Sequence, residues 1–492
     1  MAVSQASLRY AMGIKMNTNI PFIKLLSTPR GKYIYDVNRD EIVSVSEKAY
    51  HALQIIVGNK KGELDEEDTE IIEFFKSMGY LSDNHPSEIK HSKLDYIDDY
   101  LDRKIAKMTL QLTQACNLRC SYCVYSDINN ESQRTHSAKR MSFETAKKAV
   151  DFLWEHSVDS QSVNIGFYGG EPVIEFNLMK QVVEYAEELF FGKRITFSIT
   201  TNGTLFNDEI IEYLVKHDIN LAVSLDGPEE IHNKSRRFAA NGQGSFQMVS
   251  ENMERLRKQF PEYYNRVLFS MVVNPQNDFN SINTIFTDYD YMNSANVSPS
   301  IIDDIYSMEK VSYSDKFNEK MNYHLFLAFL SKLGRVDGSK VSPIALQEIN
   351  QLNDKKANMG KSGKLSDSMA PGGPCIPGHL RLLVNTEGNF YPCERVSESS
   401  EVMNIGNADD GFNIENAKAL LNVASITAEK CRDCWALIHC NLCAKQADDG
   451  NCLNPDQRLS YCDGVKDTVK EQLLDMIALE EACNESIVRR HV

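Results

Sequence analysis

The chain lacks any long hydrophobic run. Of its 492 residues, 42% are hydrophobic and 25% are charged, which is typical of a globular protein. No stretch approaches the roughly 18 consecutive apolar residues of a membrane span. The first residues, MAVSQASLRYAMGIKMNT, also lack the apolar segment and cleavage pattern of a secretory signal. These absences predict a cytoplasmic protein with no membrane partner.

An excess of positive charge is also missing. The chain has 53 Lys and Arg against 69 Asp and Glu, so its formal net charge is −16 at pH 7. Proteins that bind nucleic acids or anionic membranes usually carry the opposite imbalance. We therefore expect neither nucleic acid nor a lipid surface as a partner, while a locally basic groove for an acidic peptide stays compatible with this total.

Cysteine is absent from most of the chain. None of the 12 cysteines lies in residues 1–115 or 124–374, whereas three lie within 116–123 and eight between 375 and 462. Disulfides are rare in the reducing cytosol, and buried structural thiols would be scattered. Clustered thiols are usually ligands of metal ions or Fe–S clusters. The distribution therefore predicts two metal-binding segments.

Strand-like and helical segments alternate in the middle of the chain. The candidate strands are 108–113, 163–169, 195–202, 220–226 and 266–274. Repeated β–α alternation predicts an α/β fold with a parallel sheet or a barrel. In barrels the chemistry lies at the carboxyl ends of the strands. Distinctive residues follow the ends of four candidate strands: Cys116, Gly169–Pro172, Asn202 and Asp226.

The N-terminal part has a different pattern. Residues 22–26 and 32–37 predict a strand hairpin, and helices are expected at 47–58 and 65–81, the second beginning with acidic residues that suit its N-terminus. Residues 82–104 are polar and predict a linker. The expected domains are an N-terminal unit (16–90), an α/β core (105–310), a bridging region (311–370) and a cysteine-rich module (371–492).

The segment CNLRCSYC at 116–123 places three thiols at spacings x3 and x2 after a strand. Three thiolates can bind three irons of a cubane and leave the fourth iron without a protein ligand. Because Fe–S clusters normally take four cysteines, a set of three indicates a site reserved for another ligand. A zinc site or a structural cysteine cluster is the alternative.

This segment resembles the CxxxCxΦC signature of the radical S-adenosylmethionine (SAM) superfamily, with Tyr122 at the aromatic position. The resemblance implies a partial (β/α)6 TIM-like barrel and a [4Fe–4S] cluster on Cys116, Cys120 and Cys123, with SAM on the open iron. The reduced cluster would cleave SAM to a 5′-deoxyadenosyl radical. The cofactors carry this chemistry, and the protein positions and shields them.

Further segments resemble motifs of the same superfamily. Residues 169–172 match its GGEP motif, which holds the SAM amino group, and SITTNGT (198–204) lies where the family contacts the ribose and carboxylate. SLDGPEEIHNKSRR (224–237) resembles the peptide- and protein-modifying branch, with Arg236 rather than Arg237 matched to the SAM carboxylate. The cofactor-binding residues implied by resemblance are Tyr122, Gly169, Gly170, Glu171, Pro172, Ser198, Thr200, Asn202, Asp226 and Arg236.

The cysteine-rich module resembles the SPASM domain, which carries two auxiliary [4Fe–4S] clusters. Gly388-x4-Cys393 fits its pattern, but the spacing before Cys443 is x2 rather than x3, and Cys452 is extra. Cys452 is either a fourth ligand of the inner cluster or a bystander that leaves an open iron for a substrate thiolate. Zinc remains the alternative metal, since CxxC pairs bind it well. The implied ligands are Cys431, Cys434, Cys440 and Cys462 for the outer cluster, and Cys375, Cys393 and Cys443 for the inner one.

Residues 20–85 resemble the winged-helix-like leader-recognition elements of ribosomal-peptide maturases, which bind an extended leader by adding a strand to a sheet edge. A structural cap is the alternative. The whole chain resembles a thioether-forming maturase of the sactipeptide or ranthipeptide kind. This implies a precursor peptide with a leader sequence and an electron donor such as flavodoxin or ferredoxin as partners.

Other products stay open. Nothing in the sequence separates C–S from C–C crosslinking. In the sulfatase-maturing group, which makes formylglycine, an Asp base follows the cysteine equivalent to Cys393. This chain has Glu394 there, and we take Glu394 as a candidate catalytic base in a different geometry. The non-enzymatic alternative is a zinc-stabilised peptide-binding scaffold.

Overall fold

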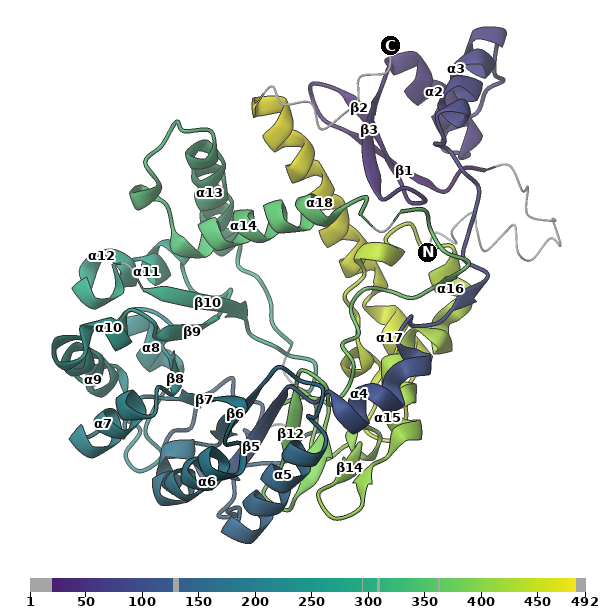
Figure 1. Ribbon diagram of the computed structural model, residues 1–492. Coiled ribbons are helices and arrows are strands. Elements are labelled where there is room, and N and C mark those ends of the chain that lie inside the picture. Colours follow the sequence, from purple (N-terminus) through teal and green to yellow (C-terminus); the bar gives the residue numbers. More distant parts are fainter. Residues whose placement is uncertain (1–19, 127–131, 294, 308–309, 362, 484–492) are drawn as a thin grey trace.

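The computed structural model describes residues 20–126, 132–293, 295–307, 310–361 and 363–483 (Figure 1). Its N-terminal unit is a three-stranded antiparallel sheet followed by two helices. Ser46 caps the first helix by accepting from the Ala49 N–H, and Asp65 and Asp68 form a capping box on the second. The elements are β1 (Ile23–Ser27), β2 (Lys32–Asp36), β3 (Glu41–Val45), α2 (Glu47–Ile56) and α3 (Glu66–Ser77).

Each face of this small sheet is covered. One face packs on α2 and α3 through a cluster that includes Ile34 and Leu53. The opposite face packs on the C-terminal helix α18 (Cys462–Cys483), where Tyr35 and Leu473 belong to one buried cluster. Figure 1 shows α18 running from the cysteine-rich module toward the sheet. Burial of apolar side chains on both faces fixes the unit against the rest of the molecule.

The core is a set of parallel strands connected by helices, as the β–α alternation predicts. Six strands, β5 to β10, pair in chain order and in parallel. The strands are β5 (Lys107–Thr113), β6 (Ser162–Gly169), β7 (Arg194–Thr201), β8 (Asn220–Ser224), β9 (Leu268–Val273) and β10 (Asn296–Ile301). The helices are α5 (Phe143–Glu155), α6 (Phe176–Leu189), α7 (Asp208–Lys216), α8 (Glu229–Ser235), α9 (Phe246–Gln259), α10 (Pro261–Tyr264), α11 (Phe279–Asn283) and α12 (Ile285–Asp288).

Two segments differ from the sequence-based expectation. β10 has the polar sequence NVSPSI and was not predicted; it lies at the edge of the sheet, where a proline is tolerated because its missing N–H faces no partner. The expected linker 82–104 contains a helix, α4 (Ile97–Arg103), whose Ile97 and Leu101 are fully buried. Two apolar residues at helical spacing were too weak a signal in a charged segment.

The cysteine-rich module continues the sheet of the core. β12 (Leu382–Val384) pairs in parallel with β5, and the antiparallel strands β13 (Asn389–Tyr391), β14 (Gly406–Asn407) and β15 (Gly411–Phe412) follow. The result is one ten-stranded, mostly parallel sheet. The other elements are β4 (Glu88–Ile89), β11 (Ser368–Met369), α13 (Asp315–Lys332), α14 (Pro343–Asn358), α15 (Ile414–Leu421), α16 (Ala428–Arg432) and α17 (Pro455–Ser460). Among the described helices, none has the length and apolar character needed to cross a membrane.

Candidate active site

Three thiols lie in the loop that follows β5. Cys116, Cys120 and Cys123 are partly buried. Burial raises the pKa of Cys116 to about 11 and that of Cys120 to about 12. Without metal these thiols therefore hold their protons at neutral pH, whereas metal ions bind the deprotonated thiolate. Cys116 Sγ accepts a hydrogen bond from the Leu118 N–H (3.4 Å).

The glycine pair after β6 allows this loop to lie against the sheet. Gly169 has φ +153°, and a Cβ there would lie 2.3 Å from the Thr113 carbonyl oxygen. A Cβ at Gly170 would lie 2.2 Å from the Ala115 carbonyl oxygen. The close approach that requires glycine is therefore made by the chain that leads into Cys116.

Glu171 is buried at the start of the short helix Pro172–Glu175. Its carboxylate accepts hydrogen bonds from the Thr201 hydroxyl (2.7 Å), the Asn202 N–H (2.7 Å) and the Val173 N–H (3.1 Å). Burial raises the pKa of Glu171 to about 6, and these hydrogen bonds oppose the shift. Its carboxylate thus ties β6 to the end of β7, a role the motif alone does not reveal.

The residues expected at the end of β7 differ in whether they lie near the thiol loop. Ser198 donates to Asn164 (2.9 Å), and Thr200 lies two residues further on the same face of the strand. It is Thr201, which the sequence reading missed, that binds Glu171. Asn202 Nδ2 donates to Asn117 (2.8 Å) and lies 4.0 Å from Cys116 Sγ. Asn202 therefore borders the thiol loop directly.

A buried polar network follows β8. The Tyr122 hydroxyl donates to Asp226 Oδ2 (2.5 Å), and the Arg236 Nε donates to the same oxygen (2.9 Å). Asp226 Oδ1 accepts from the Val272 N–H (3.2 Å). Arg237, by contrast, donates to the Gly242 carbonyl at the surface. The structure thus brings three predicted cofactor-binding residues together and places Arg237 outside the group.

His232 and Ser245 extend this network. The Asp226 N–H donates to His232 Nδ1 (3.4 Å), so the proton is on Nε2, which donates to Ser245 Oγ (2.9 Å). The Ser245 hydroxyl donates in turn to the Arg236 carbonyl (3.1 Å). Burial lowers the pKa of His232 to about 4, so the imidazole is neutral. Ser245 carries no motif signal and was missed.

Replacing Ser245 by Ala is expected to lower the free energy of unfolding by about 1–3 kcal/mol, because it leaves the His232 Nε2–H buried without an acceptor. Urea unfolding measures the change. Ser77→Ala is the matched control, since Ser77 is exposed and donates only to a local helix carbonyl. Equal stability of the two variants would show that the hydrogen bond from His232 to Ser245 does not stabilise the protein.

The cysteines of the C-terminal module fall into two groups. Burial raises the pKa of Cys434 to about 11, and the charges of Cys440 and Cys431 add to this shift; Cys462 and Cys431 act in the same way on Cys440. In the second group, burial and then the charge of Cys443 raise the pKa of Cys375, and the charge of Cys375 contributes to the raised pKa of Cys393.

Two other predicted residues have partners of their own. Cys452 is exposed, and its thiol donates to Asp449 (3.3 Å). The charges that raise its pKa are those of Asp449 and Asp448. Glu394 accepts from Arg381 (2.6 Å), and its side chain is 19% exposed. Glu394 is therefore held in an ion pair with Arg381, beside Cys393 of the second thiol group.

The donor sets suit Fe–S clusters, because cysteine thiolates are the usual ligands of such clusters. The buried guanidinium of Arg458 lies 3.6 Å from Cys431 Sγ, and within the described residues its Nε and Nη2 have no hydrogen-bond partner. Such a cation suits a negatively charged group on the thiols.

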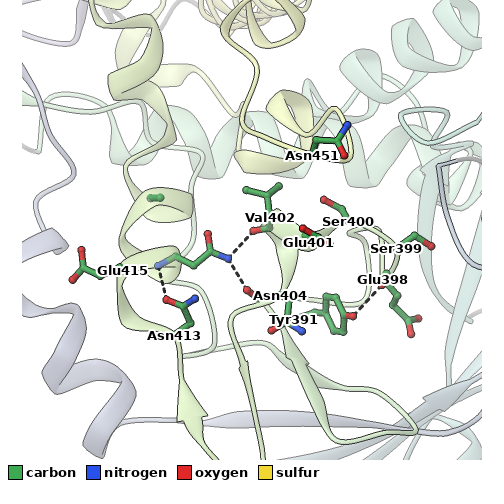
Figure 2. A pocket seen from close by; sticks show the side chains of 12 residues that line it. Tyr391, Glu398, Ser399, Ser400, Glu401, Val402, Asn404, Asn413, Glu415 and Asn451 are labelled. Atoms are coloured by element: carbon green, nitrogen blue, oxygen red, sulfur yellow. Dashed lines mark hydrogen bonds between the residues drawn. The ribbon is translucent and has the colours of Figure 1, made fainter.

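A pocket of about 740 Å³ lies elsewhere, on the cysteine-rich module. Figure 2 shows its polar lining, in which the Tyr391 hydroxyl donates to the Glu398 carbonyl (3.0 Å). The Asn416 side chain donates to the carbonyls of Val402 and Asn404. None of the predicted site residues lines this pocket, so we do not take it as the catalytic site.

Comparisons with known proteins identify the core. Residues 110–285 match the sequence model of the Radical SAM superfamily. The core of this protein is a radical SAM domain. The family implies SAM and a [4Fe–4S] cluster, for which the loop with Cys116, Cys120 and Cys123 offers the thiols.

Its relatives are diverse. An uncharacterized protein of Methanocaldococcus jannaschii is 38% identical over 25% of this chain and 39% of its own length. The radical SAM cyclopropyl synthase TigE of Paramaledivibacter caminithermalis is 26% identical over 45% of this chain and 47% of its own length. The chain thus spans less than half the length of these two relatives.

A third group consists of sulfatase-maturating enzymes. The cysteine-type anaerobic sulfatase-maturating enzyme of Clostridium perfringens is 25% identical over 57% of this chain and 72% of its own length. The solved structure "Native anSMEcpe with bound AdoMet" superposes with a TM-score of 0.56 and 20% identity, over 75% of this chain and 99% of the other. The superposition shows that the two proteins share a fold.

Proposed function

We propose that this radical SAM enzyme installs thioether crosslinks, from a cysteine sulfur to a carbon, in a ribosomally made precursor peptide. The observation that carries the proposal is the position of Tyr168 on β6. Burial, then the charge of Glu394 beside Cys393, and then that of Cys123 raise its pKa. Tyr168 therefore lies near both the loop with Cys123 and the inner thiol group with Cys393, where a peptide could contact both.

Each group of residues has a distinct task. The loop thiols hold the cluster, while Asn202 and Arg236 position SAM beside it. Bound there, the cluster and SAM supply a 5′-deoxyadenosyl radical. The inner thiols Cys375, Cys393 and Cys443 hold an auxiliary cluster, with Cys452 outside it, so that one iron is left for a cysteine of the peptide. Fixing both partners supplies the selectivity.

Polar side chains near Tyr168 are suited to contact the peptide. Glu398 Oε1 accepts from Arg134 (2.8 Å) and Gln111 (2.6 Å). The Arg134 guanidinium stacks 3.7 Å above the Tyr125 ring. Within the described residues, Arg134 Nη2 and Glu398 Oε2 are buried without a partner. A donor and an acceptor side by side match the backbone N–H and C=O of one extended residue.

The N-terminal unit supports a leader-dependent substrate. Among the described strands, β3 pairs only with β2 and so presents an edge, to which an extended leader can add a strand. The sulfatase-maturating structure is covered almost completely, yet a quarter of this chain lies outside the match. We infer that the N-terminal unit belongs to this unmatched quarter of the chain.

Formylglycine formation is the second candidate. The sulfatase-maturating relatives favour it, and one related structure contains a "Kp18Cys peptide". Against it stands the ion pair of Glu394 with Arg381 (2.6 Å), which engages the carboxylate at the position of the expected base.

The proposal predicts the mass of a modified peptide. A small cysteine-rich peptide encoded beside this gene, co-expressed with the enzyme, should lose two hydrogens per crosslink, and the crosslinked cysteines should resist alkylation after reduction. The peptide from cells with the Cys116→Ala variant is the control and should be unchanged. The same loss with every cysteine still alkylated would indicate C–C bonds instead. Formylglycine would appear as an aldehyde at a cysteine position, and an unchanged peptide would contradict the proposal.

A further inference from the structure

Arg458 on α17 is a buried cation without a carboxylate partner. Its side chain is fully buried and is among the largest such side chains in the protein. Nη1 donates to the Thr427 hydroxyl (2.8 Å) and lies 3.6 Å from Cys431 Sγ. Within the described residues, Nε and Nη2 have no hydrogen-bond partner. None of the donors of this guanidinium therefore meets an anion in the part of the chain that the structure describes.

Such an arrangement is costly. Arginine stays charged in proteins, and the effective penalty for burying an unpaired ion is several kcal/mol. Leaving two further donors unsatisfied adds to this cost. A buried guanidinium is therefore expected to face a negative charge that the polypeptide alone does not supply.

The thiols beside Arg458 are those of the outer group. The guanidinium contacts Cys431 directly. Burial raises the pKa of Cys440 and of Cys462, and the charge of Arg458 opposes both shifts. Four thiolates on a [4Fe–4S] cluster leave a net negative charge at this place, and nearby charge and hydrogen bonds to sulfur are among the factors that set a cluster's potential.

We propose that Arg458 is the internal counter-ion of an outer auxiliary cluster held by Cys431, Cys434, Cys440 and Cys462, and that it sets the reduction potential of that cluster. Arg458 acts here as a positioning residue, because it stabilises the cluster through charge and does not touch the substrate. The inference rests on the auxiliary cluster of the proposed function and is independent of which bond the enzyme forms.

The experiment compares Arg458→Met in the apoprotein and in the anaerobically reconstituted protein. In the apoprotein the substitution removes an uncompensated buried charge, so the melting temperature should rise. In the reconstituted protein the iron content should fall by up to one cluster. Any outer cluster that remains should titrate at a more negative potential, because loss of a positive charge disfavours the reduced state. Arg458→Lys keeps the charge and should retain most of the iron.

Arg432→Met is the matched control, since Arg432 is partly exposed, adjoins Cys431 and donates from its guanidinium to the Ser87 carbonyl. It should leave iron content and potential unchanged. If Arg458→Met lowers the melting temperature of both forms and leaves iron and potential at wild-type values, Arg458 is a structural residue. If the Met variant does not fold, the potential of the Lys variant decides, because a counter-ion role requires it to stay near wild type.

The outcome is separable from the peptide chemistry. A wild-type protein that holds zinc, or no cluster, on the outer thiols would overturn the counter-ion role and leave the radical SAM core standing. Should Arg458→Met behave as expected while the wild type modifies no peptide, the proposed function fails and this inference stands.

Discussion

We expect Cys116→Ala to abolish SAM cleavage and to leave the iron of the proposed auxiliary clusters in place. The thiol of Cys116 is one of only three in the loop after β5, and none of the 12 cysteines of the chain lies between 124 and 374 to replace it. Two thiolates hold a cubane poorly, so the cluster that binds SAM should be lost. Formation of 5′-deoxyadenosine measures cleavage, and iron analysis measures the remaining clusters.

Cys452→Ala is the control for that experiment. Cys452 is exposed and its thiol contacts Asp449, so we expect wild-type iron content and SAM cleavage. Persistent 5′-deoxyadenosine formation by the Cys116 variant would mean that the catalytic cluster is elsewhere. Loss of iron from the Cys452 variant would make Cys452 a ligand of the inner cluster.

Arg236→Ala should unfold the SAM site, whereas Arg237→Ala should not. The Arg236 and Asp226 side chains are 9% and 4% exposed and form a 2.9 Å ion pair. Removing one partner of a buried pair leaves an uncompensated charge and costs about 3–5 kcal/mol. Arg237 is exposed and contacts a carbonyl, so its loss should cost below about 0.5 kcal/mol. Urea unfolding measures stability, and equilibrium dialysis with SAM measures binding.

A third variant, Arg236→Lys, separates the effect of Arg236 on stability from its contact with SAM. Arg236→Lys keeps a positive charge near Asp226 and should recover part of the stability. If Arg236 also contacts the SAM carboxylate, the Lys variant should still bind SAM more weakly than the wild type. Equal SAM binding by the Arg236 and Arg237 variants would contradict the assignment of Arg236.

The alternation of strands and helices predicts the parallel core because each strand carries its own hydrophobic pattern. β10 escaped prediction since an edge strand needs few apolar residues. The resemblance to family motifs implies that Tyr122, Asp226 and Arg236 share one site, and they do form one network. The partners that satisfy such a network, Ser245 above all, come from distant segments and have no pattern of their own.

The burial of Arg458 is also not predicted by any local sequence pattern. An arginine in a short polar helix reads as a surface residue, because charged side chains are almost never fully buried unless paired. It is enclosed where α17 packs on the short helix Val423–Thr427, next to Thr427 and Cys431. Its significance depends on the thiol group it faces, which no local stretch of sequence can reveal.

The pairing of β12 with β5 has a consequence for dissecting the enzyme. The cysteine-rich module supplies the strand that closes one side of the core sheet. A chain cut at residue 370 would leave the β5 edge bare, and bare edges invite pairing with other molecules. The core is thus not independent of this module, and a chimera that takes its cysteine-rich module from a relative must also match the strand register at β5. Diversification of this architecture is therefore expected in its loops and its N-terminal unit, where exchange leaves the shared ladder intact.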